Sequence, residues 1–194
     1  MIDTAIEFAL FDTAIGCCGI AWSPCGITAV RLPEGSAAAS RQRLGRRFPG
    51  AREAAPPPAA QRVIDGIVAL LDGQPRALDD VTLDMEGVPE FNRKVYEIAR
   101  GIRWGATLSY GEIARRLGDP AAARDVGQAL GQNPFAIVVP CHRVVAAGGK
   151  WGGFSARGGV ATKRRLLSIE GASPTASKTP FDVLLPVAPP RAHP

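Results

Sequence analysis

Ligands for metal ions are scarce in this chain of 194 residues, which contains only two histidines and four cysteines. Three of the cysteines, Cys17, Cys18 and Cys25, lie near the N-terminus, and neither histidine is close to them in the sequence. Structural zinc sites use four ligands, so three thiolates do not complete one, and four unevenly spaced cysteines do not build a disulfide framework. We therefore expect no metal and no cofactor. We interpret the three N-terminal cysteines as buried strand thiols in a reducing compartment.

Long hydrophobic runs are also missing from the sequence. No apolar stretch approaches the ~20 residues that a membrane-spanning helix requires. The first four residues include an acidic one and lack the basic and then apolar pattern of a secretory signal peptide. The sequence therefore predicts a cytoplasmic protein with no membrane partner.

Acidic residues are few in the second half of the chain. Residues 91–170 contain 13 lysines and arginines against 5 acidic residues, whereas residues 1–90 contain 8 against 12. Contacts to phosphates supply most of the nonspecific affinity for nucleic acid, so a basic segment of this kind indicates an anionic polymer as partner. The alternative is a basic face that is merely solvated.

The most informative motif is Pro140-Cys141-His142-Arg143, which follows the apolar run 135–139. We expect this run to be β-like and to stop at Pro140, because proline cannot continue a hydrogen-bond ladder, so that Cys141 is presented at the end of an element. Basic neighbours favour the thiolate, which is the reactive form of cysteine. The alternative is that Cys141 is a small buried apolar residue and His142 a histidine of the core.

The first part of the chain has the pattern of a small α/β unit. Alternating apolar residues predict strands at residues 6–10, 19–22, 26–30 and 81–84. Helical character predicts helices at residues 37–48 and 61–71, with a proline-rich loop at 54–58 between them. No chemical motif lies in this part, so we expect it to be a scaffold.

The second part has the pattern of helices. One helix is expected at residues 91–102, and Ser109 and Glu112 form a capping box that starts a helix at residues 110–117. Pro120 suits the start of a further helix at 121–130, so the pair predicts a helix-turn-helix. The second helix has a surface of alanine and glycine around Arg124, which favours a helix that enters a narrow groove. Close packing against another helix is the alternative.

Further residues surround the cysteine motif in a fixed order. They are Asn133-Pro134, residues 139–145, Gly148-Gly149, residues 152–155, Leu166-Leu167 and Glu170, with residues 109–112 upstream. Together they resemble the active-site signature of the O-6-alkylguanine-DNA alkyltransferases, or methylated-DNA–protein-cysteine methyltransferases, and the similarity covers residues 91–171. The resemblance implies a ribonuclease-H-like α/β domain at residues 1–86 and a mostly helical, winged-helix-like domain with the helix-turn-helix at 87–171. Residues 172–194 are a tail that is either disordered or docked on the body.

The resemblance also implies catalytic roles. Cys141 is the expected nucleophile, and His142 accepts the thiol proton through a water while Glu170 orients and stabilises the imidazole. Asn133 is expected to connect the helix-turn-helix to the Cys141 segment, and Tyr110 to donate a hydrogen bond to the departing purine. Considered without the resemblance, Glu170 is an ordinary carboxylate at a helix end, Asn133 a turn residue and Tyr110 a packing residue.

A substrate pocket and a DNA-binding surface follow from the same resemblance. The pocket is expected to use the main chain of Cys141, Val144 and Ser155, with Trp151 and Gly152 as its wall. The helix at 121–130 is expected to dock in the minor groove, with Arg124 filling the gap left by an extruded base. The expected DNA-binding residues are Arg93, Ala122, Ala123, Arg124, Gly127, Gln128 and Gly131.

The implied activity is a single, irreversible transfer of a methyl or alkyl group from O-6-alkylguanine, and from O-4-methylthymine, to Cys141. The partner is double-stranded DNA, and the protein acts as a monomer without a cofactor. One alternative is a noncatalytic DNA-binding protein that recognises alkylguanine. Another is a cysteine hydrolase, but this chain offers no second histidine near Cys141 as a conventional base.

The sequence departs from the family pattern in one loop of the expected pocket. Residues 154–159 are two residues longer than in members whose loop reads Tyr-Ser-Gly-Gly, and the aromatic residue is Phe154. Asp125 also stands beside Arg124 where many members have alanine. The loop departure puts the tolerance for alkyl groups larger than methyl in question, and Asp125 places a negative charge next to Arg124. An apolar patch at 181–185 lies in the tail.

Overall fold

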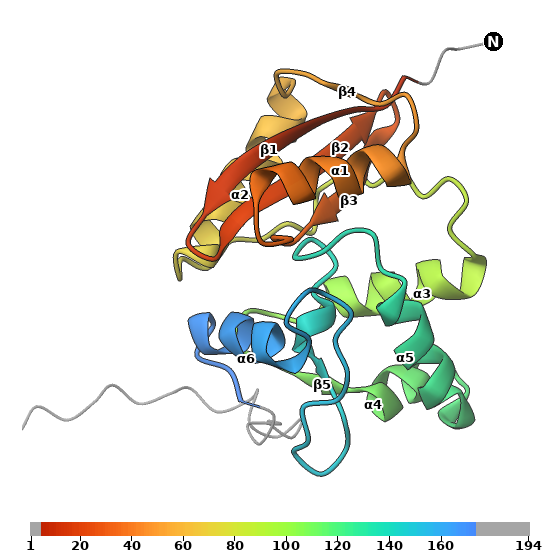
Figure 1. The fold of residues 1–194 in the computed structure, drawn as a ribbon. Coiled ribbons are helices and arrows are strands. Elements are labelled where there is room, and N and C mark those ends of the chain that lie inside the picture. The colour runs from red at the N-terminus through yellow and green to blue at the C-terminus, as the bar shows by residue number, and fades with distance from the viewer. Residues whose placement is uncertain (1–4, 174–194) are drawn as a thin grey trace, which may run out of the picture.

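The computed structural model describes residues 5–173, and its N-terminal half is a mixed sheet with helices on both faces (Figure 1). The sheet contains β1 (Glu7–Thr13), β2 (Gly16–Ser23), β3 (Gly26–Arg31) and β4 (Arg52–Glu53). Its strand order is β3-β2-β1-β4, with β1, β2 and β3 in antiparallel hairpins and β4 parallel to β1. The α/β class predicted for this half is confirmed.

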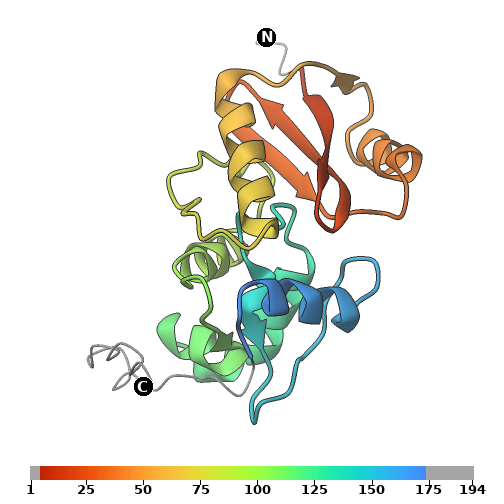
Figure 2. The same cartoon turned by 90° about the vertical axis from the view of Figure 1, so that its left-hand side faces the viewer.

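Helices α1 (Ala37–Arg47) and α2 (Pro58–Leu71) cover opposite faces of the sheet (Figure 2). Successive side chains of a strand point to opposite faces, so Phe8 packs with Leu44 of α1 while Ala9 joins the cluster that contains α2. The Ser36 hydroxyl accepts a hydrogen bond from the main chain of Ala39 and caps α1. The sheet thus buries both of its faces and forms a rigid support.

Most elements predicted for residues 1–86 are confirmed, and the strand at 81–84 is wrong. Leu83 forms only an isolated bridge with Ile27. The carboxylate of Asp84 accepts a hydrogen bond from the Ser23 hydroxyl at 2.6 Å and another from the Glu86 main chain at 3.0 Å. These contacts turn the chain away from the sheet, so the alternating pattern does not extend into a ladder.

The three N-terminal cysteines differ in exposure. Cys18 is buried, Cys17 is half-buried and Cys25 is exposed in the tight turn between β2 and β3. The interpretation of all three as buried strand thiols is therefore wrong for Cys25. Within residues 5–173 no group of three or more His, Cys, Asp or Glu side chains is placed to hold a metal ion. In the same range no helix is long and apolar enough to cross a membrane.

The C-terminal half is mostly helical, as predicted. Its elements are α3 (Glu90–Arg100), β5 (Leu108–Ser109), α4 (Tyr110–Arg116), the 3₁₀ turn η1 (Pro120–Ala122), α5 (Ala123–Gly131), the 3₁₀ turn η2 (Cys141–Arg143), β6 (Val144–Val145) and α6 (Val160–Ile169). The capping box is present, since Ser109 accepts from the Glu112 N–H and the Glu112 carboxylate accepts from the Ser109 N–H. Helices α4 and α5 form the predicted helix-turn-helix, although its second helix begins with the turn η1.

The apolar run 135–139 does not form the expected β-like segment. The Val139 N–H donates to the Phe135 carbonyl at 2.8 Å, and Ile137 has a φ of 70°. The run is therefore a tight turn. Hydrogen bonds between Val30 and the main chain of Pro134 and Ala136 attach this turn to β3. The segment that leads to Cys141 thus leans on the N-terminal sheet.

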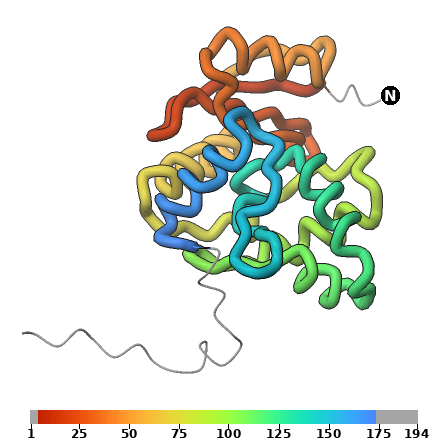
Figure 3. Tube along the Cα trace, turned by 60° about the horizontal axis from the view of Figure 1, so that its bottom comes forward, coloured from red at the N-terminus to blue at the C-terminus, as the bar shows by residue number. Residues whose placement is uncertain are grey.

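The two halves share one hydrophobic core, and the trace in Figure 3 shows them packed together. The largest cluster of buried residues joins Ile20 and Ile64 of the N-terminal half to Val95 and Ile113 of the C-terminal half. A boundary at residues 86 and 87 remains a proposal, and it lies in the connection before α3. The predicted tail lies outside the described residues from residue 174 onward, and so does its apolar patch.

Candidate active site and DNA-binding surface

Cys141 lines a cavity of about 520 Å³ between the helix-turn-helix and the loop that precedes α6. Cys141 is the first residue of η2 and follows Pro140 directly. Its N–H donates to the Val139 carbonyl at 2.8 Å. The cavity is also lined by Tyr110, Ala123, Arg124, Gly127, Leu130, Gly131, Gly153, Phe154 and Ser155. A thiol, a phenol and an exposed arginine therefore face one space.

Asn133 fixes the turn that carries the thiol. Its side-chain amide donates to the Val139 carbonyl at 2.9 Å, and its side-chain oxygen accepts from the Phe135 N–H at 2.9 Å. The residue lies two positions after the end of α5, so one side chain connects the helix-turn-helix to the segment before Cys141. This is the position that the resemblance implies for Asn133.

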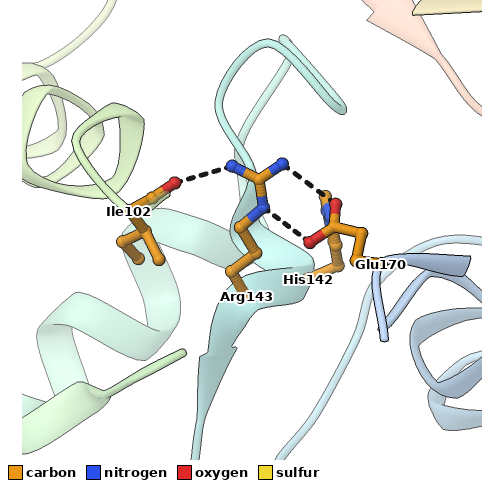
Figure 4. Close-up of polar contacts among 4 residues, drawn as sticks. All are labelled: Ile102, His142, Arg143 and Glu170. Atoms are coloured by element: carbon orange, nitrogen blue, oxygen red, sulfur yellow. Dashed lines mark hydrogen bonds and ion pairs between the residues drawn. The ribbon is translucent and has the colours of Figure 1, made fainter. Parts of the chain in front are cut away.

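Behind Cys141 lies a buried cluster of His142, Arg143 and Glu170 (Figure 4). The His142 Nε2 lies 2.8 Å from Glu170 Oε1, while Arg143 Nε and Nη2 donate to the two carboxylate oxygens at 2.9 and 3.0 Å. Arg143 Nη1 donates to the Ile102 carbonyl at 2.6 Å. Both oxygens of a carboxylate that is 9% exposed are thus satisfied by protein groups.

Burial and pairing set the charges of this cluster. Burial raises the pKa of Glu170, but hydrogen bonds and charges from His142 and Arg143 outweigh it and hold that pKa below its ordinary value. Burial lowers the pKa of His142, against the opposing effect of Glu170. A neutral His142 beside an ionised carboxylate has its proton on Nε2, where it donates to Glu170, so Nδ1 remains the acceptor.

The basic neighbours of Cys141 in the sequence do not lower the pKa of its thiol in the free protein. Burial raises the pKa of its thiol, and the hydrogen bond from Asn133 and the charge of Lys163 only oppose this effect. The physical reason is that Arg143 does not act on the sulfur, because its guanidinium is bound to Glu170 and Ile102. The thiol therefore has to lose its proton during the reaction.

Lys163 is a functional candidate that the sequence reasoning missed. It is fully buried on α6, and its ammonium donates to the carbonyls of Val144 and Gly153 and lies 5.8 Å from the centre of the Tyr110 ring. Burial lowers its pKa to about 8, with Cys141 opposing the shift. A signal was present, because Lys163 occupies the apolar face of α6 three and four residues before Leu166 and Leu167.

Tyr110 forms the opposite side of the cavity. Its hydroxyl donates to the Gly153 carbonyl at 3.4 Å, and its ring lies directly against Gly152, which has a φ of 70°. A side chain on Gly152 would collide with the Tyr110 ring. Burial and then the nearby Cys141 raise the pKa of Tyr110, so the phenol remains a donor at neutral pH.

Three of the expected pocket residues need correction. Ser155 lines the cavity, but Val144, Trp151 and Gly152 do not. The Val144 carbonyl accepts a hydrogen bond from the Lys163 ammonium, and Gly152 lies against the Tyr110 ring. Trp151 packs instead with Val145, Leu167 and Ala172, and Arg164 lies 5.4 Å from its ring centre.

The expected DNA-binding residues fall into two groups. Ala123, Arg124, Gly127 and Gly131 line the cavity, and Gln128 is exposed on α5. Ala122 is only 4% exposed and packs in the core, so its assignment to the DNA surface is wrong.

Arg93 does not line the cavity. Its guanidinium donates to the carbonyls of Val88 and Met85 at 2.8 and 2.7 Å. These two bonds attach Arg93 to the connection between the two halves. The side chain is exposed and a guanidinium has further N–H donors, so its contact with DNA stays a prediction.

Comparison with known proteins gives consistent matches. Residues 90–172 match the family described as 6-O-methylguanine DNA methyltransferase, DNA binding domain. A methylated-DNA–protein-cysteine methyltransferase of Methanothermobacter thermautotrophicus is 37% identical over 155 residues, which cover 80% of each chain. One from Mycobacterium tuberculosis is 44% identical over 126 residues, or 65% of this chain and 74% of that one.

Solved structures agree with these sequence matches. Mycobacterium tuberculosis OGT in complex with DNA has a TM-score of 0.70 at 35% identity, covering 85% of this chain and 92% of that chain. The O6-methylguanine methyltransferase of the same organism has a TM-score of 0.68 at 33% identity, covering 92% and 98%. The likeness therefore includes both halves of the fold.

Proposed function

This chain belongs to the O-6-alkylguanine-DNA alkyltransferase, or methylated-DNA–protein-cysteine methyltransferase, family of DNA-repair proteins, and we propose that Cys141 is its alkyl acceptor. The supporting observation is that Cys141, Tyr110 and the α5 residue Arg124 line one cavity. The substrates are O-6-alkylguanine and O-4-methylthymine in double-stranded DNA, and the protein acts as a cytoplasmic monomer without a cofactor.

The chemistry is an in-line displacement at the alkyl carbon. The bond from Cys141 sulfur to carbon forms while the bond from carbon to guanine O6 breaks, and the electron pair of that bond stays with guanine. Tyr110 donates a hydrogen bond to the departing base. The thiol proton passes through a water to His142, whose imidazolium the Glu170 carboxylate stabilises. The thioether product has no neighbouring group to reverse it, so each molecule acts once.

The resting charges fit this order of events. The thiol is protonated in the free protein, while His142 is neutral and Glu170 ionised, so the acceptor for the proton is prepared in advance. The ammonium of Lys163 attracts negative charge on the sulfur as the proton leaves. Substrate that fills the cavity displaces water and strengthens these interactions. The thiolate therefore forms only when an alkylated base is in the cavity.

Guanine O6 lies inside a duplex, so the nucleotide has to leave the stack, which costs a few kcal/mol. The small residues of α5 allow its backbone to approach the minor groove closely. Arg124 is exposed at the mouth of the cavity that holds Cys141. A base that enters this cavity leaves a gap in the duplex next to Arg124, and the guanidinium occupies it.

Incubation with a duplex that contains O-6-methylguanine tests the proposed acceptor. We expect one methyl group per protein molecule, on the peptide that contains Cys141, and no further transfer with excess DNA. Burial raises the pKa of the competing thiol Cys18 to about 12, which leaves it unreactive. Peptide mass spectrometry identifies the modified residue. Continued turnover, or methyl on Cys17, Cys18 or Cys25, contradicts the proposal.

Arg124→Ala separates nucleotide flipping from binding. If Arg124 fills the space of the extruded base, the variant repairs a methylated duplex about 100-fold more slowly, since a few kcal/mol of unstacking is no longer offset. The salt dependence of binding falls by only about one unit of slope. Transfer from the free O-6-methylguanine base, which needs no flipping, is expected to survive.

Two variants serve as controls for this measurement. Arg116→Ala removes an exposed arginine of α4 that does not line the cavity, and it should leave duplex repair nearly unchanged. Arg124→Lys keeps the charge but not the planar guanidinium, so it should remain slow. Equal losses on duplex and free base in Arg124→Ala would show that the arginine supports the fold or the pocket instead.

A further inference from the structure

An arginine of the loop between β6 and α6 contacts the N-terminal half. Arg157 Nη1 donates to the main-chain carbonyl of Glu34 in the connection between β3 and α1. Gly35 has a φ of 100°, and a Cβ at this position would collide with the Arg157 guanidinium. Figures 2 and 3 show this loop lying next to the N-terminal half. A side chain at position 35 would therefore displace the guanidinium, and the positive φ of Gly35 disfavours other residues there.

Both sides of this contact are fixed to their own half. The Glu34 carboxylate pairs with Arg43 of α1 at 3.0 Å, and the Glu34 N–H donates to the Ser40 hydroxyl. On the loop side, the Arg157 carbonyl accepts from the Thr162 hydroxyl of α6 at 2.6 Å. The contact thus joins two anchored segments and restricts the loop between them.

The same loop forms one wall of the alkyl-acceptor cavity. Gly153, Phe154 and Ser155 line that cavity with Cys141, and Gly153 is held from inside by Tyr110 and Lys163. Phe154 and Ala156 pack against the main core. Ser155 lies two residues before Arg157 in the same loop. A contact that holds Arg157 therefore also restricts the Ser155 end of this wall.

We propose that Arg157 and Gly35 form a latch between the two halves, and that this latch limits the size of the alkyl group that Cys141 accepts. Loop 154–159, which is expected to be longer than in some members of the family, reaches Glu34 through Arg157. With the latch closed, Phe154 and Ser155 are held toward Cys141 and leave room for small alkyl groups. Release of the latch lets the wall move outward, so larger groups enter. The inference rests on the proposed function, because it concerns the substrates of the same thiol.

The test compares transfer of benzyl and methyl groups in the full chain. Single-turnover rate constants are measured with the free bases O-6-benzylguanine and O-6-methylguanine, so that contacts of Arg157 with DNA phosphates play no part. We expect Arg157→Ala to raise the ratio of benzyl to methyl rate constants about tenfold or more, the scale of discrimination between pockets that differ by one or two methylene groups.

A variant on the opposite side of the latch gives an independent measurement. Gly35→Ala places a methyl group where the guanidinium lies, so it should raise the same ratio without any change in the loop. The double variant should show no further increase, because both changes break one contact. Arg165→Ala is the matched control, since Arg165 also links the halves, through the Ala14 carbonyl at 2.8 Å, but lies on α6 outside the cavity wall.

The outcomes separate the latch from the proposed function. Wild type that transfers neither group from the free bases and no methyl group from a methylated duplex would overturn the proposed function itself. Wild type that transfers methyl, with a ratio unchanged in Arg157→Ala, would overturn only the latch. An equal slowing of both groups in Arg157→Ala, or an equal rise of the ratio in Arg165→Ala, would also overturn it, because loosened packing of the halves then explains the effect. Thermal unfolding of each variant, followed by circular dichroism, shows whether the fold is retained.

Discussion

Replacement of Cys141 by alanine is expected to abolish methyl transfer completely while DNA affinity stays close to that of the wild type. No other thiol of the described residues lines the cavity, so no side chain there can replace the sulfur as acceptor. In the proposed mode of binding, affinity comes from phosphate contacts and from α5, which the substitution does not touch. Transfer of labelled methyl from duplex DNA measures the loss, and a gel-shift titration at fixed salt measures affinity.

Cys25→Ala is the matched control for this prediction. Cys25 is exposed and lies in the turn between β2 and β3, so its removal should leave both transfer and affinity unchanged. Residual transfer by Cys141→Ala would mean that another residue accepts the alkyl group. A large fall in affinity would mean that the cysteine supports the DNA-binding surface, and its role as acceptor would have to be established separately.

Local signals in the sequence predicted much of the fold. The capping box of Ser109 and Glu112 sets the start of α4 through contacts within one turn, so its prediction needed no knowledge of the rest of the chain. The hairpin of β2 and β3 similarly follows from two alternating runs, at residues 19–22 and 26–30, that are separated by only three residues. Elements of this kind depend on neighbours in sequence.

Predictions that depended on distant neighbours were less successful. The run 135–139 is as apolar as a strand, but its burial comes from the shared core. The Val139 N–H closes a tight turn onto Phe135, and the Ala136 N–H donates to Val30 of β3, more than one hundred residues away. The prediction that basic neighbours favour the thiolate was incomplete for a similar reason. It counted the charge of Arg143 by its place in the sequence, whereas the fold pairs that charge with Glu170.

The candidate site shows the same division. Pattern alone favoured a surface carboxylate for Glu170, and only the family resemblance placed it beside His142. The fold brings the two together because α6 ends where η2 packs against it. Lys163 and Arg143 were missed as site residues because a buried cation is recognised by its partners in the fold. Lys163 donates to the Val144 carbonyl, and Arg143 donates to Glu170.

Arg143→Met is expected to lower the free energy of unfolding by about 3–5 kcal/mol, because it leaves a buried carboxylate without its charged partner. Methionine keeps the apolar length of the side chain but removes the donors to both Glu170 oxygens and to the Ile102 carbonyl. Urea unfolding followed by circular dichroism measures the change. Transfer should slow as well, because Glu170 then no longer holds His142 in place.

The loss of stability caused by Arg143→Met should become smaller at acidic pH. The pKa of Glu170 is lowered in the folded protein, so its pairing stabilises the fold above the ordinary carboxyl pKa, and this stability is lost as pH falls through the folded value. The difference between wild type and Arg143→Met should therefore be large at neutral pH and shrink in acid. In Glu170→Gln, where the carboxylate is absent, addition of Arg143→Met should cost less than it does alone.

An exposed pair provides the comparison that decides the interpretation. Arg41 donates to the Glu53 carboxylate at 2.6 Å, but both side chains are about half exposed, so solvent screens the attraction. Arg41→Met should therefore lower stability much less than Arg143→Met and should leave methyl transfer unchanged. Equal losses from the two variants, or a loss in Arg143→Met that does not depend on Glu170, would show that packing of the arginine stem and not its charge stabilises the site. The carboxylate of Glu170 would then need another source for its lowered pKa, and the proposed path of the proton through His142 would lose its support.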